Sequence, residues 1–244
     1  MMDKPLGQRP RDAAVAAMNE PLEATLVRWR DESAALARSG VYSWLIERVP
    51  GTRVLEIGCG FGASTSALMK AGKSVFALDN RMDCLEATRA QVPEAIYGLA
   101  DVHHYDDRLL EDLNQFAPDA VVCWLAGAPA DALPRDVPEA YAVMQHRLVL
   151  QQAVVRLAGR LDSVQTVHLA DRTAFAWKMK DTGRQTMVRM LTSAVLVDTS
   201  FSVAEADVQF RKLEGVLNTS AAQALPGFVP VIGEATLKRR HNAA

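Results

Sequence analysis

Three glycines within five residues, placed directly after a short apolar run, constrain this chain more than any other feature of its sequence. The run 53–57 is typical of a buried strand, and Gly58, Gly60 and Gly62 follow it at alternate positions. A helical pattern then begins at Ala63. Glycine lets the backbone turn sharply and lets a ligand approach it closely. The segment therefore predicts a strand, a ligand-binding turn and a helix in direct succession.

Strand-like and helix-like segments alternate beyond this turn. Apolar runs predict strands and helical periodicity separates them. The predicted strands are 53–57, 74–78, 95–99, 120–125 and 164–170, and the predicted helices are 63–71, 82–91, 109–116 and 136–159. Repeated strand–helix units favour a parallel sheet with helices on both faces. We therefore expect an α/β, doubly wound sheet.

Segments outside this alternation add helices before the sheet and strands after it. Residues 1–20 are rich in proline, glycine and charge and are expected to form a flexible arm, followed by helices at 21–38 and 41–49. Later segments predict a helix at 182–197, strands at 203–213 and 234–240, and a loop over 214–233. We expect one domain over 21–244, with a helical cap at 21–50 and the core sheet and helices at 53–241.

Composition excludes several other classes of protein. Hydrophobic residues make up 49% of the 244 residues and charged residues 23%, as in an ordinary globular protein. No apolar run approaches the roughly 20 residues of a membrane span, and the first residues lack the apolar core of a secretory signal. Cys59, Cys84 and Cys123 are too few for a disulfide framework. We expect a cytoplasmic, reducing setting.

The charge is small overall and unevenly spread. A net charge of −2 gives no general attraction to nucleic acid or to a membrane. Residues 171–244 nevertheless hold ten Lys or Arg and seven Asp or Glu, a local charge of +3. A solvated surface explains this asymmetry most simply, and contact with RNA or an anionic substrate is the alternative.

The glycine turn and three acidic residues together resemble the motifs of class I S-adenosylmethionine-dependent methyltransferases. Glu56 lies two residues before the first glycine, Asp79 ends the second predicted strand, and Asp101 follows the third. The glycines also satisfy a relaxed dinucleotide-binding pattern. The acids, and a third glycine only two residues after the second, favour the methyltransferase family over a nicotinamide enzyme. The resemblance spans residues 21–241.

The resemblance implies S-adenosylmethionine as the cofactor. A carboxylate at Asp79 can accept hydrogen bonds from both ribose hydroxyls, Asp101 would accept from the adenine amino group, and the glycine turn would hold the methionine half. The implied cofactor-binding residues are Glu56, Gly58, Cys59, Gly60, Gly62, Asp79, Asn80, Asp101, Val102 and Trp124. The resemblance also implies a Rossmann-like sheet of seven strands, mostly parallel, whose last strand is antiparallel.

No motif identifies the methyl acceptor. The segment 123–129 lacks the Asn/Asp/Ser-Pro-Pro-aromatic motif of the family's base-amino methyltransferases, so DNA is not expected as the substrate. A general base is needed only if the acceptor arrives protonated. The candidates for that base are His103, His104, Tyr141, His146, His168 and Asp171. Asp171, His168 and His104 are the ones carried forward, and His146 is expected to be solvated or packed. No metal is expected, because no acid follows the fourth predicted strand until Asp131.

Two readings of the function remain open beside the expected one. We expect methyl transfer to an O or N of a small molecule. One alternative is an RNA or protein methyltransferase of the same fold, which a continuous basic surface joining Lys178, Lys180 and Arg184 to 238–240 would favour. The other is a subunit that binds S-adenosylmethionine without catalysis. Trp29, Tyr42 and Trp44 are expected either in the core or in an aromatic lid.

Overall fold

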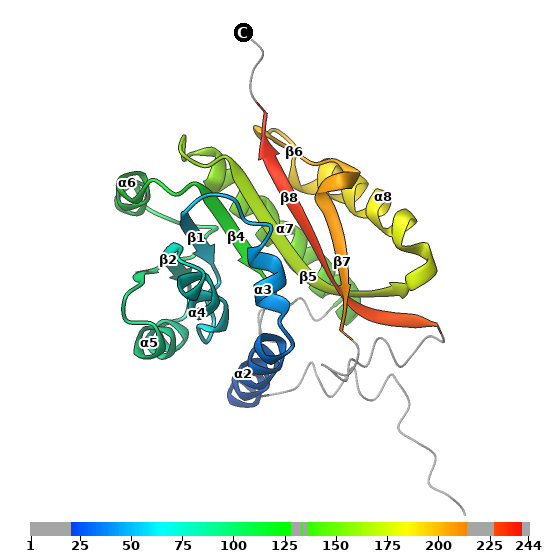
Figure 1. Ribbon diagram of the computed structural model, residues 1–244, viewed down its shortest axis with the longest axis horizontal. Coiled ribbons are helices and arrows are strands. Elements are labelled where there is room, and N and C mark those ends of the chain that lie inside the picture. The colour runs from blue at the N-terminus through cyan, green and yellow to red at the C-terminus, as the bar shows by residue number, and fades with distance from the viewer. Residues whose placement is uncertain (1–20, 128–132, 134–135, 214–226, 241–244) are drawn as a thin grey trace, which may run out of the picture.

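An eight-stranded mixed sheet, covered by helices on both faces, forms the centre of the structure (Figure 1). The computed structural model describes residues 21–127, 133, 136–213 and 227–240. The expected arm at 1–20 and Asp131 lie outside these residues. The strands are β1 Arg53–Ile57, β2 Ser74–Asp79, β3 Ile96–Leu99, β4 Ala120–Trp124, β5 Thr166–Ala176, β6 Phe201–Ser202, β7 Val208–Lys212 and β8 Phe228–Arg239.

The strand order confirms the expected fold class. Across the sheet it is β3-β2-β1-β4-β5-β8-β6, with β7 also paired to β8. Strands β1 to β5 all run parallel to one another, and β8 runs antiparallel to β5. The main path holds the seven expected strands, and an eighth, β7, is added because two short strands share β8. β6 pairs with Lys238 and Arg239, whereas β7 pairs with residues 231–235.

Most helices lie where the helical periodicity predicts them. They are α2 Leu22–Arg38, α3 Val41–Ile46, α4 Ala63–Lys70, α5 Met82–Gln91, α6 Asp107–Phe116, α7 Glu139–Gly159 and α8 Lys180–Met190, which continues as a π-helical turn at Leu191–Val195. Short 3-10 turns lie at Trp177–Met179 and Glu205–Asp207. Within the described parts of the chain, none of these helices has both the length and the apolar character needed to cross a membrane.

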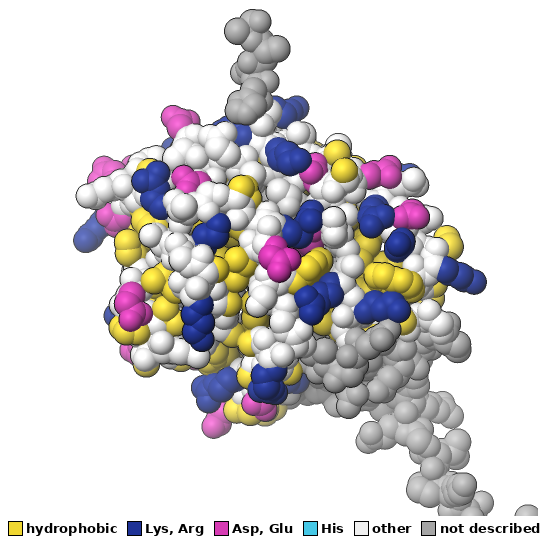
Figure 2. Space-filling model, in the orientation of Figure 1, with side chains coloured by type: hydrophobic (Ala, Val, Ile, Leu, Met, Phe, Trp, Pro, Cys, Tyr) yellow, Lys and Arg dark blue, Asp and Glu magenta, His cyan; other side chains and the backbone are white. Residues whose placement is uncertain are grey.

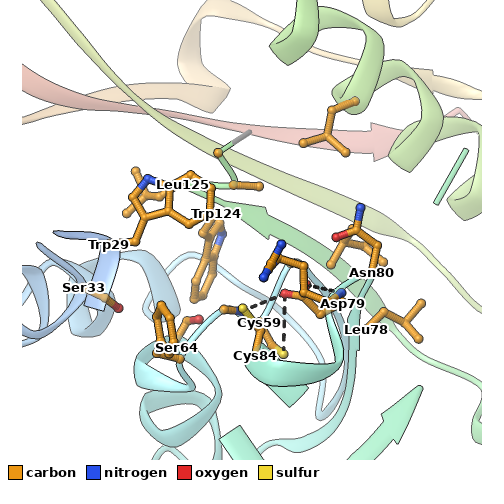
Figure 3. A pocket seen from close by; sticks show the side chains of 18 of the residues that line it. Trp29, Ser33, Cys59, Ser64, Leu78, Asp79, Asn80, Cys84, Trp124 and Leu125 are labelled. Carbon is orange, nitrogen blue, oxygen red and sulfur yellow. Dashed lines mark hydrogen bonds between the residues drawn. The ribbon is translucent and has the colours of Figure 1, made fainter. Parts of the chain in front are cut away.

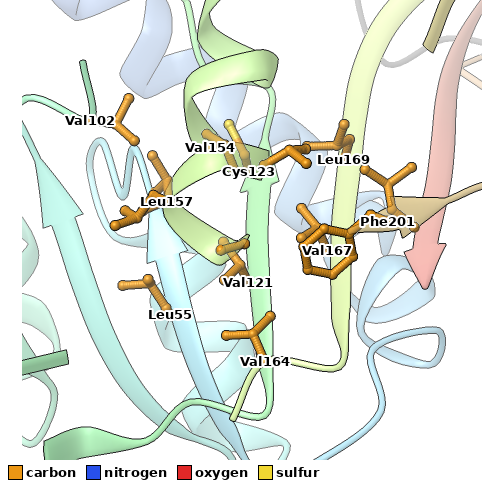
Figure 4. Packing of buried hydrophobic residues seen from close by; sticks show 14 of the residues in the cluster. Leu55, Val102, Val121, Cys123, Val154, Leu157, Val164, Val167, Leu169 and Phe201 are labelled. Carbon is orange, nitrogen blue, oxygen red and sulfur yellow. The ribbon is translucent and has the colours of Figure 1, made fainter. Parts of the chain in front are cut away.

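The central parallel strands β1, β2 and β4 are buried on both faces, which explains why they read as continuous apolar runs, whereas the edge strand β3 is partly exposed. Alternate side chains point to opposite faces. On one face, Leu55 and Val121 pack against α6, α7 and the π-helical turn, as Figure 4 shows for Val154 and Leu157 of α7. On the other face, strand residues such as Val54 pack against α2 to α5. The cap helices α2 and α3 are therefore part of the core packing.

The ribbon of β5 and β8 is longer than the apolar runs indicate. β5 continues to Ala176, six residues beyond the predicted end, and β8 begins at Phe228, six residues before the predicted start. The two strands pair along eleven residues, so each provides hydrogen-bond partners for the other where the apolar pattern is weak. The predicted loop at 214–233 was therefore wrong for residues 228–233, and its residues 214–226 lie outside the described part.

Candidate functional site

A cavity of about 570 Å³ lies at the carboxyl ends of β1, β2 and β4, the edge at which open α/β sheets bind ligands. In Figure 3, Trp29 and Trp124 lie across the cavity from Asp79 and Asn80. Of the residues predicted to bind the cofactor, all except Glu56 and Gly62 line it. The predicted residues that line the cavity are Gly58, Cys59, Gly60, Asp79, Asn80, Asp101, Val102 and Trp124.

Asp79 joins the end of β2 to the glycine turn. Its Oδ2 atom accepts a hydrogen bond from the backbone N–H of Gly60 at 2.9 Å, and its Oδ1 atom accepts one from Arg81 at 3.0 Å. Burial raises the pKa of Asp79, and these two backbone donors oppose the shift. Gly60 has a φ of 53°, and a Cβ there would meet no atom within 4 Å. The turn therefore leaves open space beside the carboxylate.

Glu56 and Gly62 do not line the cavity. They shape the site indirectly, from positions behind its wall. The buried carboxylate of Glu56 accepts hydrogen bonds from the hydroxyls of Ser64 and Thr65, the latter at 2.6 Å, and so ties β1 to the first turn of α4. Gly62 has a φ of 80°, and a Cβ there would lie 2.9 Å from Cγ2 of Thr88 on α5. Glycine at this position permits the close packing of α4 on α5.

We expect the stability of the protein to fall as pH rises from about 4.5 to about 7. Burial raises the pKa of Glu56 from its ordinary value of 4.5 to about 7, so the folded state binds a proton in this range more tightly than the unfolded state. Its stabilising effect is complete below the unfolded pKa and is lost as pH rises through the folded pKa, with a slope of up to about 1.4 kcal/mol per pH unit.

Urea unfolding between pH 4.5 and 7.5 tests this prediction. The Glu56→Gln variant should show a flatter dependence of unfolding free energy on pH, because it cannot titrate. A residual slope of the same sign is expected from Asp171, since burial raises its pKa to about 6. An unchanged slope in Glu56→Gln would contradict the assignment.

Trp124 is held in the cavity wall by a chain of buried polar groups. Its indole N–H donates to Nδ1 of His168 at 2.7 Å, and Nε2 of His168 lies 2.7 Å from Glu234. Arg48 forms an ion pair with the other oxygen of Glu234. Because an indole N–H can only donate, Nδ1 of His168 is the acceptor, and Nε2 carries the proton that it donates to Glu234.

Two candidates for a general base therefore lie away from the cavity. His168 is fully buried behind Trp124, where both of its ring nitrogens have partners, and it does not line the cavity. Asp171 was expected beyond a strand end, but it lies within β5, pairs with Arg147 and does not line the cavity. Strand pairing with β8 continues past both residues and carries Asp171 into the packed part of the sheet.

Two other candidate histidines line the cavity. His103 lines it and His104 does not, because the chain turns at 101–104, with the His103 N–H donating to Asp101 Oδ1 at 2.9 Å. His146 of α7 also lines it, contrary to the expectation that it is solvated or packed. Burial lowers the pKa of His146. No local signal indicates this residue, since its position depends on how α7 packs over the sheet.

The cap helices form the outer wall of the cavity. Trp29 and Ser33 of α2 and Tyr42 of α3 line it, and the hydroxyls of Ser33 and Tyr42 are 3.1 Å apart. Arg172 of β5 also lines it and forms an ion pair with Glu32 of α2. Two of the three aromatic residues proposed for a lid thus face the cavity. Trp44 is instead packed against the core on the α2–α5 face.

The charges around the cavity suit a cation better than a pyrophosphate. Its acidic lining residues are Glu32, Asp79 and Asp101. Its basic lining residues other than histidine are Arg81 and Arg172, and each pairs with an acid, Asp83 and Glu32 respectively. The N-terminus of α4 could accept a phosphate, but the three acids of the lining disfavour a pyrophosphate, whereas they suit a sulfonium and an amino group. Among the described residues, no group of three His, Cys, Asp or Glu is placed to hold a metal ion.

The basic residues of the final quarter do not form one surface. Lys178 and Lys180 follow β5 beside the Phe228 end of β8, and residues 238–240 lie at the opposite end of that twelve-residue strand. Residues 238–240 also have partners within the fold. Lys238 pairs with Asp207, Arg239 donates to three backbone carbonyls, and Arg240 donates to that of Thr199. The arrangement that would favour RNA is therefore absent from the described residues.

Comparison with known proteins finds likeness only to solved structures. No protein-family model and no curated protein matches the sequence. One similar structure is the magnesium protoporphyrin IX methyltransferase ChlM from Synechocystis PCC 6803 with bound SAH, 16% identical, with 91% of this chain and 89% of that chain covered and a TM-score of 0.46.

Two other methyltransferase structures are similar to the same extent. The plantazolicin methyltransferase BpumL, in complex with a substrate analogue and SAH, is 12% identical, with 95% of this chain and 96% of that chain covered and a TM-score of 0.47. The 23S rRNA methyltransferase ErmE is 15% identical, with 82% and 67% covered and a TM-score of 0.42.

Proposed function

We propose that this protein is a S-adenosylmethionine-dependent methyltransferase that acts on an O or N of a small-molecule acceptor. The observation that carries the proposal is the position of Asp79. Its carboxylate ends β2, is held by the N–H of the glycine turn and lines a cavity at the carboxyl edge of the sheet. A carboxylate held in this way is suited to a ribose diol, because charge-assisted hydrogen bonds are the stronger ones.

The lining residues divide into parts that fit the parts of the cofactor. Asp79 would hold the ribose, Asp101 and Val102 would hold the adenine, and the turn at Gly58–Gly60 would hold the methionine half. The open space beside Gly60 supports this assignment, since a side chain there would occupy the cavity. Glu56 would act indirectly, by holding the first turn of α4 against β1.

Positioning accounts for most of the catalysis that this site can offer. S-Adenosylmethionine, when bound, supplies a methyl group already activated by its positive sulfur. The protein's part is to hold an acceptor in line and exclude water, which is an effective source of rate. Trp29, Tyr42 and Trp124 provide an aromatic enclosure on the outer side of the cavity. His103 and His146 both line the cavity and are the candidates to take a proton from the acceptor, and burial favours the neutral form of His146.

Calorimetric titration with S-adenosylhomocysteine tests the cofactor assignment. We expect saturable binding at one site, and no binding of NADH under the same conditions, because the acids lining the cavity disfavour a pyrophosphate. Methyl transfer is then measured with radiolabelled S-adenosylmethionine and a panel of small hydroxyl and amine acceptors. Absence of any heat with S-adenosylhomocysteine, in protein shown to be folded, would overturn the proposal. Binding without transfer to any acceptor would favour a non-catalytic binding subunit.

A further inference from the structure

A second hollow adjoins the cofactor cavity. An open groove of about 1040 Å³ runs between the cap helices α2 and α3 on one side and α4 and α5 on the other. Ser33, Tyr42 and Phe61 line both spaces, so the groove and the cavity meet at these side chains. Figure 2 shows yellow side chains in a hollow between the positions of α3 and α4, with dark blue side chains near it. The cofactor assignment makes no use of this groove.

Small apolar side chains give this alanine groove its width. Both of its walls carry alanines, namely Ala34 and Ala37 from α2, Ala63 and Ala67 from α4, and Ala87 and Ala90 from α5. Helices that face each other with only methyl groups leave room for a third apolar body between them. Such a space favours an apolar chain or ring, because burying it removes apolar surface from water.

The polar residues of the alanine groove are mainly cations. Arg30, Arg38 and Lys70 line it, against one acid, Glu47. No ion pair joins these three cations to another described residue, and Arg30 lies over the ring of Phe61, 4.8 Å from its centroid. The groove therefore combines an apolar lining with a local charge of +2. An occupant that complements both properties is apolar along its length and negatively charged at one end.

We infer that the alanine groove binds an anionic amphiphile of the fatty-acid type with its carboxylate beside Arg30 at the junction, and that a carboxylate oxygen is the methyl acceptor. The new O–CH3 bond would form as the S–CH3 bond of S-adenosylmethionine breaks, so the products would be a methyl ester and S-adenosylhomocysteine. This inference rests on the proposed methyltransferase function. The groove reaches the cavity at Tyr42 and Ser33, so a molecule lying along α4 can extend one end toward the methyl donor. The helix α4 runs from Ala63, near that junction, to Lys70, about 10 Å away at 1.5 Å per residue.

A chain-length series provides the sharpest measurement. Octanoate, decanoate and dodecanoate, each below its micelle concentration, are titrated into the protein saturated with S-adenosylhomocysteine. Affinity should rise about fourfold for each added methylene, as burial of a methylene group predicts. The carboxylates should not displace S-adenosylhomocysteine. Competition between the two would place the carboxylates in the cofactor cavity and overturn the inference.

A matched pair of variants tests the location of binding. Ala37→Trp fills the groove from an exposed position on α2, and Ala24→Trp adds the same bulk at an exposed position of α2 outside the groove. The first should lower decanoate affinity at least tenfold, whereas the second should leave it unchanged. Neither should alter binding of S-adenosylhomocysteine. Equal effects of the two variants would contradict the assignment to the groove.

The charge is tested separately from the apolar lining. Arg30→Met should weaken decanoate binding up to about fivefold, the effect of one exposed ion pair, and should leave decanol binding unchanged. Analytical ultracentrifugation measures the oligomeric state and so tests the main alternative occupant, a second copy of this chain in the groove. A dimer that Ala37→Trp dissociates and Ala24→Trp does not would overturn the inference. Failure of all carboxylates to bind, with S-adenosylhomocysteine bound normally, would overturn this inference alone and leave the proposed function standing.

Discussion

Replacing Asp79 with alanine is expected to weaken binding of S-adenosylhomocysteine about 30-fold. The carboxylate is the one negatively charged group held by the glycine turn itself, through the N–H of Gly60. Losing a charge-assisted hydrogen bond to a buried ligand costs about 2 kcal/mol, and the fold-change follows from that energy. Calorimetry at neutral pH measures the effect directly. Asp79→Asn should lie between wild type and alanine, since the amide keeps one acceptor oxygen.

Asp83→Ala is the matched control for this prediction. Asp83 is an acid near Asp79 in sequence, but its side chain is exposed at the start of α5 and pairs with Arg81. Its removal should change affinity by less than a factor of five. Thermal melting of each variant separates loss of binding from loss of folding. An Asp79→Ala variant that is folded and binds normally would show that the ribose lies elsewhere in the cavity.

Replacing Glu234 with alanine is expected to lower the free energy of unfolding by about 3–5 kcal/mol. Glu234 is fully buried in β8 and joins two partners, the Nε2 atom of His168 and the guanidinium of Arg48. Removing one member of such a network leaves the others unpaired in the core, and that desolvated state carries the cost. Urea unfolding at neutral pH measures the change. Glu234→Gln should cost less, because the amide can still accept from His168.

Lys238→Ala on the same strand is the control for Glu234. Its ammonium pairs with Asp207, but the side chain is 60% exposed, so its removal should cost at most about 1 kcal/mol. A second readout distinguishes a positioning role from a purely stabilising one. In folded Glu234→Gln protein, the tryptophan fluorescence response to S-adenosylhomocysteine should change if Glu234 helps to orient Trp124 through His168. Equal losses of stability in Lys238→Ala and Glu234→Ala would contradict the network argument.

The local parts of the fold were predictable from the sequence, because they depend on short-range patterns. The run at Arg53–Ile57, the three glycines and the helix from Ala63 all lie where the pattern places them. The same holds for Asp79 and Asp101, because an acid that follows a parallel strand reaches the carboxyl edge of the sheet wherever the strand is placed. These two kinds of segment supply much of the cavity's lining, namely Ile57, Gly58, Cys59, Gly60, Phe61, Ser64, Asp79 and Asp101.

The long-range parts were not predictable in this way. β5 and β8 extend beyond their apolar runs because residues about 60 positions apart pair with each other. This pairing moved Asp171 from an expected strand end into the sheet. His168 and Glu234 were a candidate base and an ordinary strand acid in the sequence, and only their contact shows that they form one buried network with Trp124.

The sequence by itself therefore determined the strand–turn–helix unit, the parallel sheet and the acids at its carboxyl edge. Each of these follows from spacing within about twenty residues, where backbone geometry leaves few alternatives. Tertiary structure alone decided the outer half of the site. Trp29, Tyr42, His146 and Arg172 come from four elements that meet only when the cap and α7 pack on the sheet. The alanine groove has the same origin, because it exists only where α2 and α4 face each other across their smallest side chains.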